Sequence, residues 1–319
     1  MKVAIIILVG IIAGIIILEL ALRRIAGFGK PLIYISDPEI GYLLAPSQKT
    51  RRLGNSIEIN RYSMRSPEIT LEPSESTLRI LLLGDSIVNG GWWTDQADIL
   101  SVQIQQQLTT DNTVEVLNMS ANSWGPPNQL AYLQKHGIFQ AEIIVLVINT
   151  DDLFSKIPNP LIVGRDRNYP DKLPPFALWE FFSRYFGSTS PVPEPPQPEA
   201  VTKDPVGFNL DKITKIKQHI LSENAQFLLA MTPLLREIGE SGPRDYEVKA
   251  RQRLTALTEE ENITFIDFLP LFNQIPNSET LYRDHIHLSV SGNQIVSQKL
   301  SQQLKESFNN LPNIRETSP

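Results

Sequence analysis

Two short motifs at opposite ends of the chain carry residue types that together could perform nucleophilic catalysis. The first is Gly84-Asp85-Ser86, and the second is Asp284-His285-Ile286-His287. A serine hydroxyl becomes a nucleophile when an imidazole accepts its proton, and a carboxylate must hold that imidazole in the correct tautomer. The motifs therefore predict a serine hydrolase with Ser86 as nucleophile, His287 as base and Asp284 as the orienting carboxylate.

The histidines also leave a second chemistry open. Of the four histidines, His136 and His219 fall in predicted helices, where surface or packing roles are expected. His285 directly follows Asp284 and is poorly placed to be oriented by it, but His285 and His287 form an H-x-H pair that could bind a metal. The further ligands would be Asp85, Asp151 or Asp152. Because no second histidine cluster exists, we predict neither a metal nor another cofactor.

The composition excludes several other kinds of protein. With 319 residues, 41% hydrophobic and 20% charged, the chain can bury a substantial core and is neither disordered nor fibrous. A net charge of −6 offers no general attraction to a phosphate backbone, so no nucleic-acid partner is expected. Without cysteine there is no disulfide, thiol nucleophile or cysteine-ligated metal. Neither a G-x-S-x-G elbow nor a glycine-rich nucleotide motif occurs.

The N-terminus has the length and composition of a membrane-spanning helix. Residues 3–18 carry no charge, and after Glu19 the apolar run continues to Leu22. About twenty helical residues cross the roughly 30 Å hydrocarbon core, and Glu19 would reach the headgroups from the last turn. We predict a single-pass anchor over residues 1–25, because no small-residue cleavage site follows; a cleaved signal peptide is the alternative.

The flanking charges bear on the orientation of this anchor. Arg23, Arg24 and Lys30 follow the apolar run, whereas only Lys2 and the terminal amine precede it. A positive-inside bias would keep the rest of the chain cytoplasmic, but the excess is small and long domains translocate regardless. We place the domain on the extracytoplasmic, periplasmic side and keep the cytoplasmic side as the alternative.

Apolar runs and helical patterns alternate from Leu78 onward. The short apolar runs are Leu78–Leu83, Val114–Leu117, Ile143–Ile148, Phe227–Ala230 and Ile263–Ile266. Runs of this length suit strands of a parallel sheet that are buried on both faces. The helical stretches between and after them are about 96–109, 127–137, 209–222, 244–260 and 292–307. This alternation predicts an α/β fold with helices on both faces of a five-stranded parallel sheet.

The remaining segments complete the predicted domain organisation. Residues 26–76 contain scattered prolines and predict an extended or β-rich lead-in to a hydrolase domain over 77–310. A proline-rich insertion at about 155–207 holds a short amphipathic helix around Trp179–Phe186, expected to pack in the core or face the membrane, followed by an exposed loop from Gly187 to Pro205. Residues 311–319 form a tail.

The motifs and their order resemble the SGNH, or GDSL-type, hydrolases, which include esterases, lipases, carbohydrate acetylesterases and O-acetyltransferases. The resemblance spans about 76–310: Gly84-Asp85-Ser86 matches the nucleophile block, and Asp284-x-x-His287 matches the family's D-x-x-H. It implies a three-layer α/β/α, flavodoxin-like fold and an esterase mechanism. The lead-in Ile59-Asn-Arg-Tyr-Ser-Met-Arg is also similar to that of anchored members.

The two middle blocks depart from the family pattern. Ser120 stands where the family's N-x-G has its glycine, and Asp151 stands where its G-x-N-D has the asparagine that donates to the oxyanion. The resemblance implies an oxyanion hole from the backbone of Ser86 and Ser120. We expect Asn149 to supply the missing amide, with Asn122 as a second candidate.

The departures predict an active enzyme with a rearranged oxyanion hole. Loss of one oxyanion donor costs roughly 10²–10³ in kcat, whereas loss of the nucleophile or base costs on the order of 10⁶. The leading function is a membrane-anchored serine esterase acting on an acyl ester, an O-acetyl ester included, of a small molecule or carbohydrate. The alternatives are an O-acyltransferase for an envelope polysaccharide and a non-catalytic binding protein. Trp92 and Trp93 follow the nucleophile motif and are expected to pack on the sheet edge; the alternative is that they meet the substrate and stack on a sugar ring.

Overall fold

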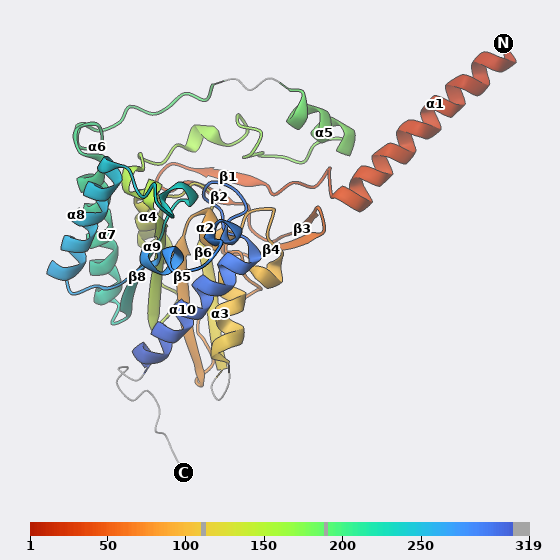
Figure 1. Cartoon of the computed structure of the whole chain (residues 1–319). Helices are drawn as coiled ribbons and strands as arrows, with labels where there is room; N and C mark the ends of the chain where they lie inside the picture. The colour runs from red at the N-terminus through yellow and green to blue at the C-terminus, as the bar shows by residue number, and fades with distance from the viewer. Residues whose placement is uncertain (110–112, 188–190, 309–319) are drawn as a thin grey trace.

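A computed structural model describes residues 1–109, 113–187 and 191–308 of the chain. Figure 1 shows a sheet flanked by helices, from which one long N-terminal helix projects. The predicted tail, residues 311–319, lies outside the described residues.

Five parallel strands form the central sheet. They are β5 (Thr77–Gly84), β6 (Thr113–Ser120), β7 (Ile143–Asn149), β8 (Gln226–Thr232) and β9 (Thr264–Asp267). Their order is β6-β5-β7-β8-β9, so the chain reverses its direction of travel across the sheet between β5 and β7. Ligands of open α/β sheets bind at such a switch point, beyond the carboxyl ends of the strands. The predicted three-layer α/β fold is confirmed.

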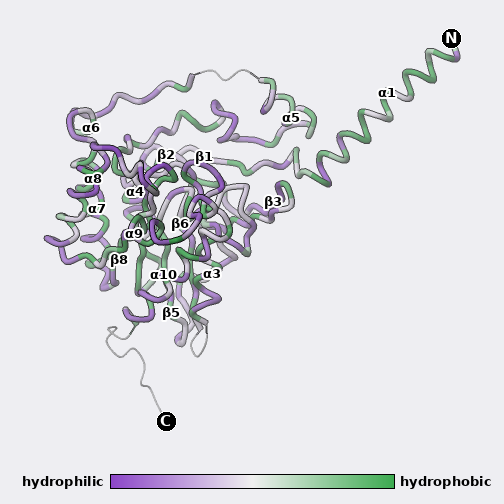
Figure 2. The backbone as a smooth tube through the Cα atoms, in the orientation of Figure 1, coloured by the Kyte–Doolittle hydropathy of each residue, from purple (hydrophilic) through white to green (hydrophobic). Residues whose placement is uncertain are grey.

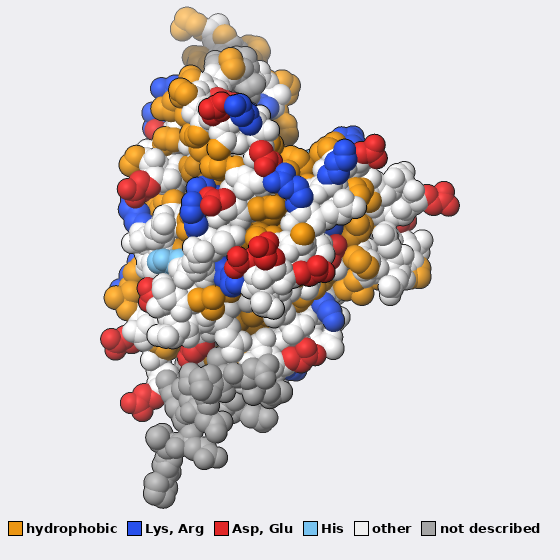
Figure 3. Space-filling view, turned by 90° about the vertical axis from the view of Figure 1, so that its left-hand side faces the viewer, with side chains coloured by type: hydrophobic (Ala, Val, Ile, Leu, Met, Phe, Trp, Pro, Cys, Tyr) orange, Lys and Arg blue, Asp and Glu red, His pale blue; other side chains and the backbone are white. Residues whose placement is uncertain are grey.

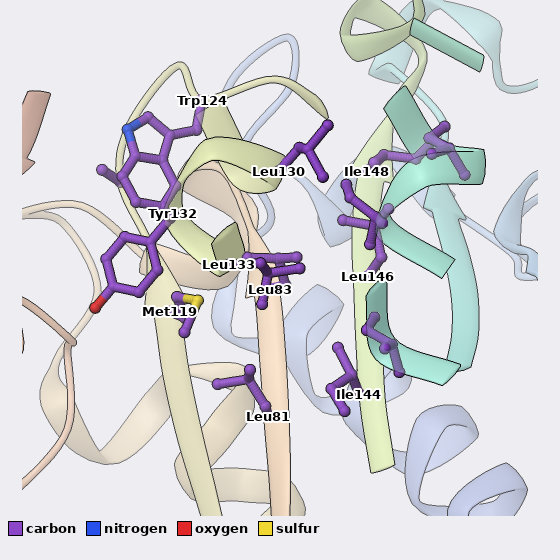
Figure 4. Packing of buried hydrophobic residues seen from close by; sticks show 14 of the residues in the cluster. Leu81, Leu83, Met119, Trp124, Leu130, Tyr132, Leu133, Ile144, Leu146 and Ile148 are labelled. Atoms are coloured by element: carbon purple, nitrogen blue, oxygen red, sulfur yellow. The ribbon is translucent and has the colours of Figure 1, made fainter. Parts of the chain in front are cut away.

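Helices cover both faces of this sheet. The α-helices after the first are α2 (Ser86–Asn89), α3 (Leu100–Leu108), α4 (Pro126–His136), α5 (Ala177–Tyr185), α6 (Glu199–Lys203), α7 (Pro205–Ser222), α8 (Asp245–Glu260), α9 (Phe268–Asn273) and α10 (Val290–Phe308). Side chains of α4, α7 and α8 pack on one face of the strands, and those of α3, α9 and α10 pack on the other. Figure 4 shows α4 against β5, β6 and β7.

The alternation of side chains along each strand divides the core in two. Leu81 and Leu83 of β5 join the cluster under α4, whereas Ile80 and Leu82 join the cluster under α3 and α10. All four are fully buried, which explains why β5 reads as a continuous apolar run. Each predicted strand lies within or one residue beyond an observed strand. The short α2, α6 and α9 were not predicted, because four to six residues show no helical period.

Single-turn helices occupy several connections. They are η2 (Gln96–Asp98), η3 (Thr150–Phe154), η4 (Pro160–Ile162), η5 (Leu235–Glu237) and η6 (Ser278–Leu281). The first predicted helix, over 96–109, is therefore divided into η2 and α3. Ile99 has an extended backbone between them, with ψ of 154°.

The lead-in folds as two antiparallel hairpins. The first pairs β1 (Tyr34–Asp37) with β2 (Gly41–Leu44), and the second pairs β3 (Gln48–Arg52) with β4 (Asn55–Ile59). Buried residues of both hairpins, Tyr34, Leu44 and Ile57 among them, belong to the same core cluster as the α4 face of the sheet. The hairpins thus pack directly on the α/β unit, near its carboxyl edge.

The insertion between β7 and β8 holds η4, α5 and α6. Helix α5 matches the predicted amphipathic helix. The exposed loop expected from Gly187 to Pro205 is confirmed over residues 191–198, which form neither helix nor strand, whereas residues 199–203 form α6 and bury Val201. Residues 188–190 lie outside the described residues. Five helical residues in a proline-rich stretch leave no local periodic signal.

The N-terminal helix α1 (Lys2–Ala21) continues as the short π-helix η1 (Leu22–Ala26). Figure 2 shows α1 as apolar on all sides, and none of its residues is buried. Together they are long and apolar enough to cross a membrane, a criterion that signal sequences also meet.

By contrast, the face of the molecule in Figure 3, beside α7 and α8, mixes acidic, basic and small apolar patches.

Candidate active site

The first motif forms the sharp connection between β5 and α2. A Cβ on Gly84 would lie 2.4 Å from Val88 Cγ2 and 2.8 Å from the Val147 carbonyl oxygen, which is closer than atoms pack. Asp85 caps α2, because its Oδ1 accepts a hydrogen bond from the Ile87 N–H at 2.8 Å. Glycine and a capping aspartate therefore place Ser86 at the carboxyl end of strand β5, beside the switch point of the sheet.

The two predicted motifs meet at this point. His287 Nε2 lies 3.0 Å from Ser86 Oγ, and His287 Nδ1 lies 2.8 and 3.0 Å from the carboxylate oxygens of Asp284. With its proton on Nδ1, directed at the carboxylate, the imidazole keeps a lone pair on Nε2 to accept the Oγ–H proton. The fold thus joins residues 201 positions apart in the arrangement that activates a serine.

The D-x-x-H spacing corresponds to a tight turn. Asp284 Oδ1 accepts hydrogen bonds from the backbone N–H groups of Ile286 at 3.1 Å and His287 at 2.9 Å. Burial raises the pKa of Asp284, but these N–H donors and the imidazole outweigh it, so the pKa lies below its usual range. The carboxylate is therefore ionised at neutral pH and fixes both the turn and the ring.

His285 points away from this site. Its side chain is 81% exposed, and its Nδ1 lies 3.9 Å from Asp284 Oδ1. The H-x-H pair therefore does not converge, and Asp85 and Asp152 are engaged elsewhere. Across the residues that the structure describes, no three His, Asp or Glu side chains are placed to hold a metal ion.

Two buried carboxylates lie behind Ser86 and share one amide. Asn149 Nδ2 donates to Asp85 Oδ2 at 2.9 Å and to Asp152 Oδ2 at 3.2 Å. Burial raises the pKa of Asp85 to about 6, and burial together with the charge of Asp85 raises that of Asp152 well above its usual range. Asn149 thus bridges the two carboxyl groups.

The three oxyanion candidates and Asp151 occupy different places. Ser120 ends β6 opposite Gly84, and its φ is not positive, so a serine fits where the family has glycine. The Asn149 amide faces the two carboxylates and does not line the cavity in front of Ser86. Asn122 does line that cavity, and its Oδ1 is buried without a hydrogen-bond partner among the described residues. Asp151 is exposed outside the cavity.

The cavity in front of Ser86 has a volume of about 270 Å³ and is walled by the lead-in, the insertion and the loop after α2. This volume suits a small ligand or one part of a larger one. Three cations line it: Lys30, Arg52 and Arg184. Glu180 pairs with both Arg52 and Arg184, so this wall keeps a net positive charge.

Trp93 lies directly beside His287. Its ring lies 4.3 Å from the His287 imidazole, centre to centre, and it lines the cavity with Trp92. Gly91, with a φ of 51°, permits this approach, because a Cβ there would lie 2.4 Å from the Trp93 ring. Trp92 and Trp93 therefore lie at the cavity, where the alternative expectation placed them.

Arg65 is a positioning residue that sequence reasoning did not assign. Its side chain is fully buried and donates to the carbonyl oxygens of Asn89, Gly91 and Thr94 at 2.5–2.6 Å. These bonds hold the loop that carries Trp93. The signal was present in the lead-in motif that ends in Arg65, but the sequence could not reveal which carbonyls it meets.

The family model of GDSL-like lipases and acylhydrolases matches residues 82–295, well over half of the chain. The chain belongs to this GDSL-like lipase/acylhydrolase family. It is accordingly a serine hydrolase that acts on ester bonds. The match begins within β5 and ends within α10, so it includes both motifs of the site.

This GDSL-like hydrolase is similar to several solved structures of low sequence identity. A lipase/acylhydrolase from Enterococcus faecalis is 14% identical, with a TM-score of 0.46, over 72% of this chain and 96% of its own. A lipolytic G-D-S-L family protein from Veillonella parvula is 14% identical, with a TM-score of 0.46, over 72% of this chain and 98% of its own. The acetylxylan esterase Axe2 from Geobacillus stearothermophilus is 14% identical, with a TM-score of 0.46, over 71% of this chain and 94% of its own. No curated protein matches the chain.

Proposed function

We propose that this GDSL-like hydrolase is a membrane-anchored serine esterase that cleaves small acyl esters, O-acetyl esters of carbohydrates included, through Ser86, His287 and Asp284. The observation that carries the proposal is the hydrogen-bonded chain from Ser86 Oγ through the His287 ring to Asp284, with contacts of 3.0 and 2.8 Å. It opens onto a cavity that admits a small ester group.

The proposed reaction has two halves. Ser86 Oγ attacks the ester carbonyl carbon while His287 Nε2 accepts the hydroxyl proton, and collapse of the tetrahedral intermediate releases the alcohol, which takes that proton. Water then attacks the acyl-serine, gives its proton to His287 and releases the carboxylic acid, and Ser86 regains its proton. Asp284 stays ionised throughout and stabilises the imidazolium, in keeping with its lowered pKa.

The oxyanion hole combines backbone and side-chain donors in this proposal. The N–H groups of Ser86 and Ser120 remain the backbone candidates. For the side-chain amide we now favour Asn122 over Asn149, because Asn122 lines the cavity while the Asn149 amide donates to Asp85 and Asp152. Asn149 then acts as a positioning residue for Asp85, which caps the nucleophile helix.

Membrane attachment through an uncleaved α1 is the second part of the proposal. Its support is Glu19, whose two carboxylate oxygens accept the backbone N–H groups of Ala177 and Leu178 at 2.8 and 2.9 Å. Cleavage after the span would remove this contact between Glu19 and α5. Retention of the full chain in carbonate-washed membranes would support the anchor.

We propose the extracytoplasmic side for the catalytic domain, where envelope carbohydrates carry ester groups. If the domain is exported through the general secretory pathway, a C-terminal alkaline phosphatase fusion should be active. A C-terminal green fluorescent protein fusion should then show no fluorescence. The opposite pattern would place the domain in the cytoplasm, as the charges after α1 favour.

Ser86→Ala tests the chemistry. It should abolish turnover of a chromogenic acetyl ester and labelling by a fluorophosphonate probe while leaving the thermal unfolding midpoint within a few degrees. Ser123→Ala is the matched control, since Ser123 lines the same cavity but hydrogen-bonds Tyr169 instead of His287. Equal turnover in Ser86→Ala and the wild type would end the proposal.

A further inference from the structure

Helix α5 exposes an aromatic surface that the enzyme reaction does not use. Phe176, Trp179, Phe182, Tyr185 and Phe186 are each more than half exposed. Positions 176, 179, 182 and 186 recur at helical spacing, so they form one stripe. Such a concentration of large exposed side chains on one short helix marks a surface that another phase or molecule covers.

The opposite side of α5 is firmly attached to the body. Glu180 is buried and accepts a hydrogen bond from the Gly29 N–H at 2.6 Å, in addition to its ion pairs with Arg52 and Arg184. The Phe181 ring packs edge-on against that of Phe28 at 5.5 Å. Because these contacts fix the rotation of α5, its outward aromatic stripe is a defined feature of the fold.

The same helix is joined to the apolar helix α1. Both Glu19 oxygens accept backbone N–H groups in the first turn of α5, and Arg23 binds Glu19 at 2.6 Å. An apolar groove lies between the two helices, with Ile15, Ile16 and Leu20 on one side and Phe176, Trp179 and Phe182 on the other. Figure 1 shows α5 at the base of α1, where that helix joins the body.

The polar groups around this junction fit a headgroup layer. Arg24 is exposed in η1, at the end of the apolar segment, and Lys30 is exposed just after it. Arg165 and Arg167 are exposed on the segment that lines the other side of α5. Basic side chains attract lipid phosphates, and Trp, Tyr and Phe concentrate at the boundary between headgroups and acyl chains. The apolar surface of α1 therefore continues onto α5 at the depth where an interfacial helix would lie.

We propose that α5 is an interfacial helix whose aromatic stripe inserts into the lipid bilayer beside α1. The occupant of this surface is the lipid itself. The proposal rests on α1 spanning the membrane, as put forward above, but not on the esterase chemistry. Since Arg52 and Arg184 of the Ser86 cavity both bind Glu180 of α5, docking holds one wall of that cavity at the membrane surface.

The test uses the full chain in vesicles of phosphatidylcholine and phosphatidylglycerol, with lipids brominated near the carbonyl end of the acyl chain as quenchers. Among the four tryptophans, Trp179 should account for most of the bromine quenching. Trp179→Phe should therefore remove most of it, whereas Trp92→Phe, which changes a tryptophan of the cavity, should leave it unchanged. Carbonate extraction is measured on the same samples to establish that α1 is inserted.

The double variant Trp179→Ser/Phe182→Ser provides a second reading. It should lose the quenching but retain turnover of a soluble chromogenic ester within about twofold, because neither side chain lines the Ser86 cavity. Equal quenching in wild type and Trp179→Phe, with α1 inserted, would overturn the proposal. So would cross-linking through α5 to a second copy that shields Trp179 from lipid. An inactive wild type would instead refute the esterase function and leave the quenching result standing.

Discussion

Asp284→Asn separates the electrostatic role of the carboxylate from its structural role. The asparagine carbonyl oxygen can occupy the place of Oδ1 and still accept the backbone N–H groups of Ile286 and His287. Its amide nitrogen then replaces Oδ2, 2.8 Å from His287 Nδ1. That nitrogen is a donor and is the nearer of the two side-chain atoms to Nδ1, so it favours the tautomer with Nδ1 as acceptor and the ring proton on Nε2.

This change of tautomer removes the general base. An Nε2–H group 3.0 Å from Ser86 Oγ cannot accept the hydroxyl proton. In serine hydrolases with this geometry, the equivalent exchange lowers kcat by about 10⁴, which corresponds to roughly 5.5 kcal/mol of transition-state stabilisation. The turn itself keeps both backbone hydrogen bonds, so the free energy of unfolding should change by less than about 1 kcal/mol.

The assay is steady-state hydrolysis of a chromogenic acetyl ester, combined with denaturant unfolding of the same variants. Asp284→Ala is the comparison, because it also abolishes the two backbone hydrogen bonds and should cost a further 1–3 kcal/mol, roughly, of stability. If Asp284→Asn kept more than about a tenth of the wild-type kcat, against the expected 10⁴-fold loss, the assignment of Asp284 as orienting group would be refuted.

Three further predictions concern the residues around this chain of hydrogen bonds. Asn122→Ala should lower kcat by about 10²–10³ with little change in KM, as expected for an oxyanion donor; if Asn149→Ala does this and Asn122→Ala does not, the two assignments are reversed. Arg65→Met should lower the free energy of unfolding, measured in denaturant, by roughly 2–4 kcal/mol. The reason is that the carbonyl oxygens of Asn89, Gly91 and Thr94 lose their buried donor. A loss below about 1 kcal/mol would contradict the positioning role of Arg65. Because its pKa is raised, folded Asp152 keeps its proton at pH values where the unfolded chain, with a pKa of about 4, has released it. The wild type should therefore lose stability relative to Asp152→Asn as the pH rises from about 4 through the raised pKa. Thermal unfolding of both proteins at several pH values checks this, and a pH-independent difference would exclude the raised pKa.

Much of the fold follows from local patterns in the chain. Strands β5 and β7 are buried on both faces, so their apolar runs are continuous and could be recognised without any tertiary information. The short helices could not be recognised in this way. Helices α9 and α6 span only six and five residues, and a periodic signal does not develop over that length.

The candidate site divides in the same way. Ser86, Asp284 and His287 could be identified because the nucleophile follows a strand and the carboxylate and imidazole lie within one turn of each other. The direction of a single side chain is a different matter. Asn149 stands two residues from the family position and looked like a replacement donor, yet its amide binds Asp85 and Asp152. No pattern in the sequence indicates that Glu19 accepts the backbone N–H of Ala177 in α5, 158 residues away.

The sequence by itself determined the layered α/β architecture, the apolar N-terminal helix and the residue types of a serine hydrolase, because each depends on periodicity or on spacing within a few residues. Only the tertiary structure decided which groups meet: His287 and Ser86 across 201 positions, Trp93 against the imidazole, Arg65 under the nucleophile loop, and α5 against α1. Those contacts arise where the carboxyl ends of parallel strands and two insertions converge, and side-chain packing between distant segments leaves no pattern along the chain.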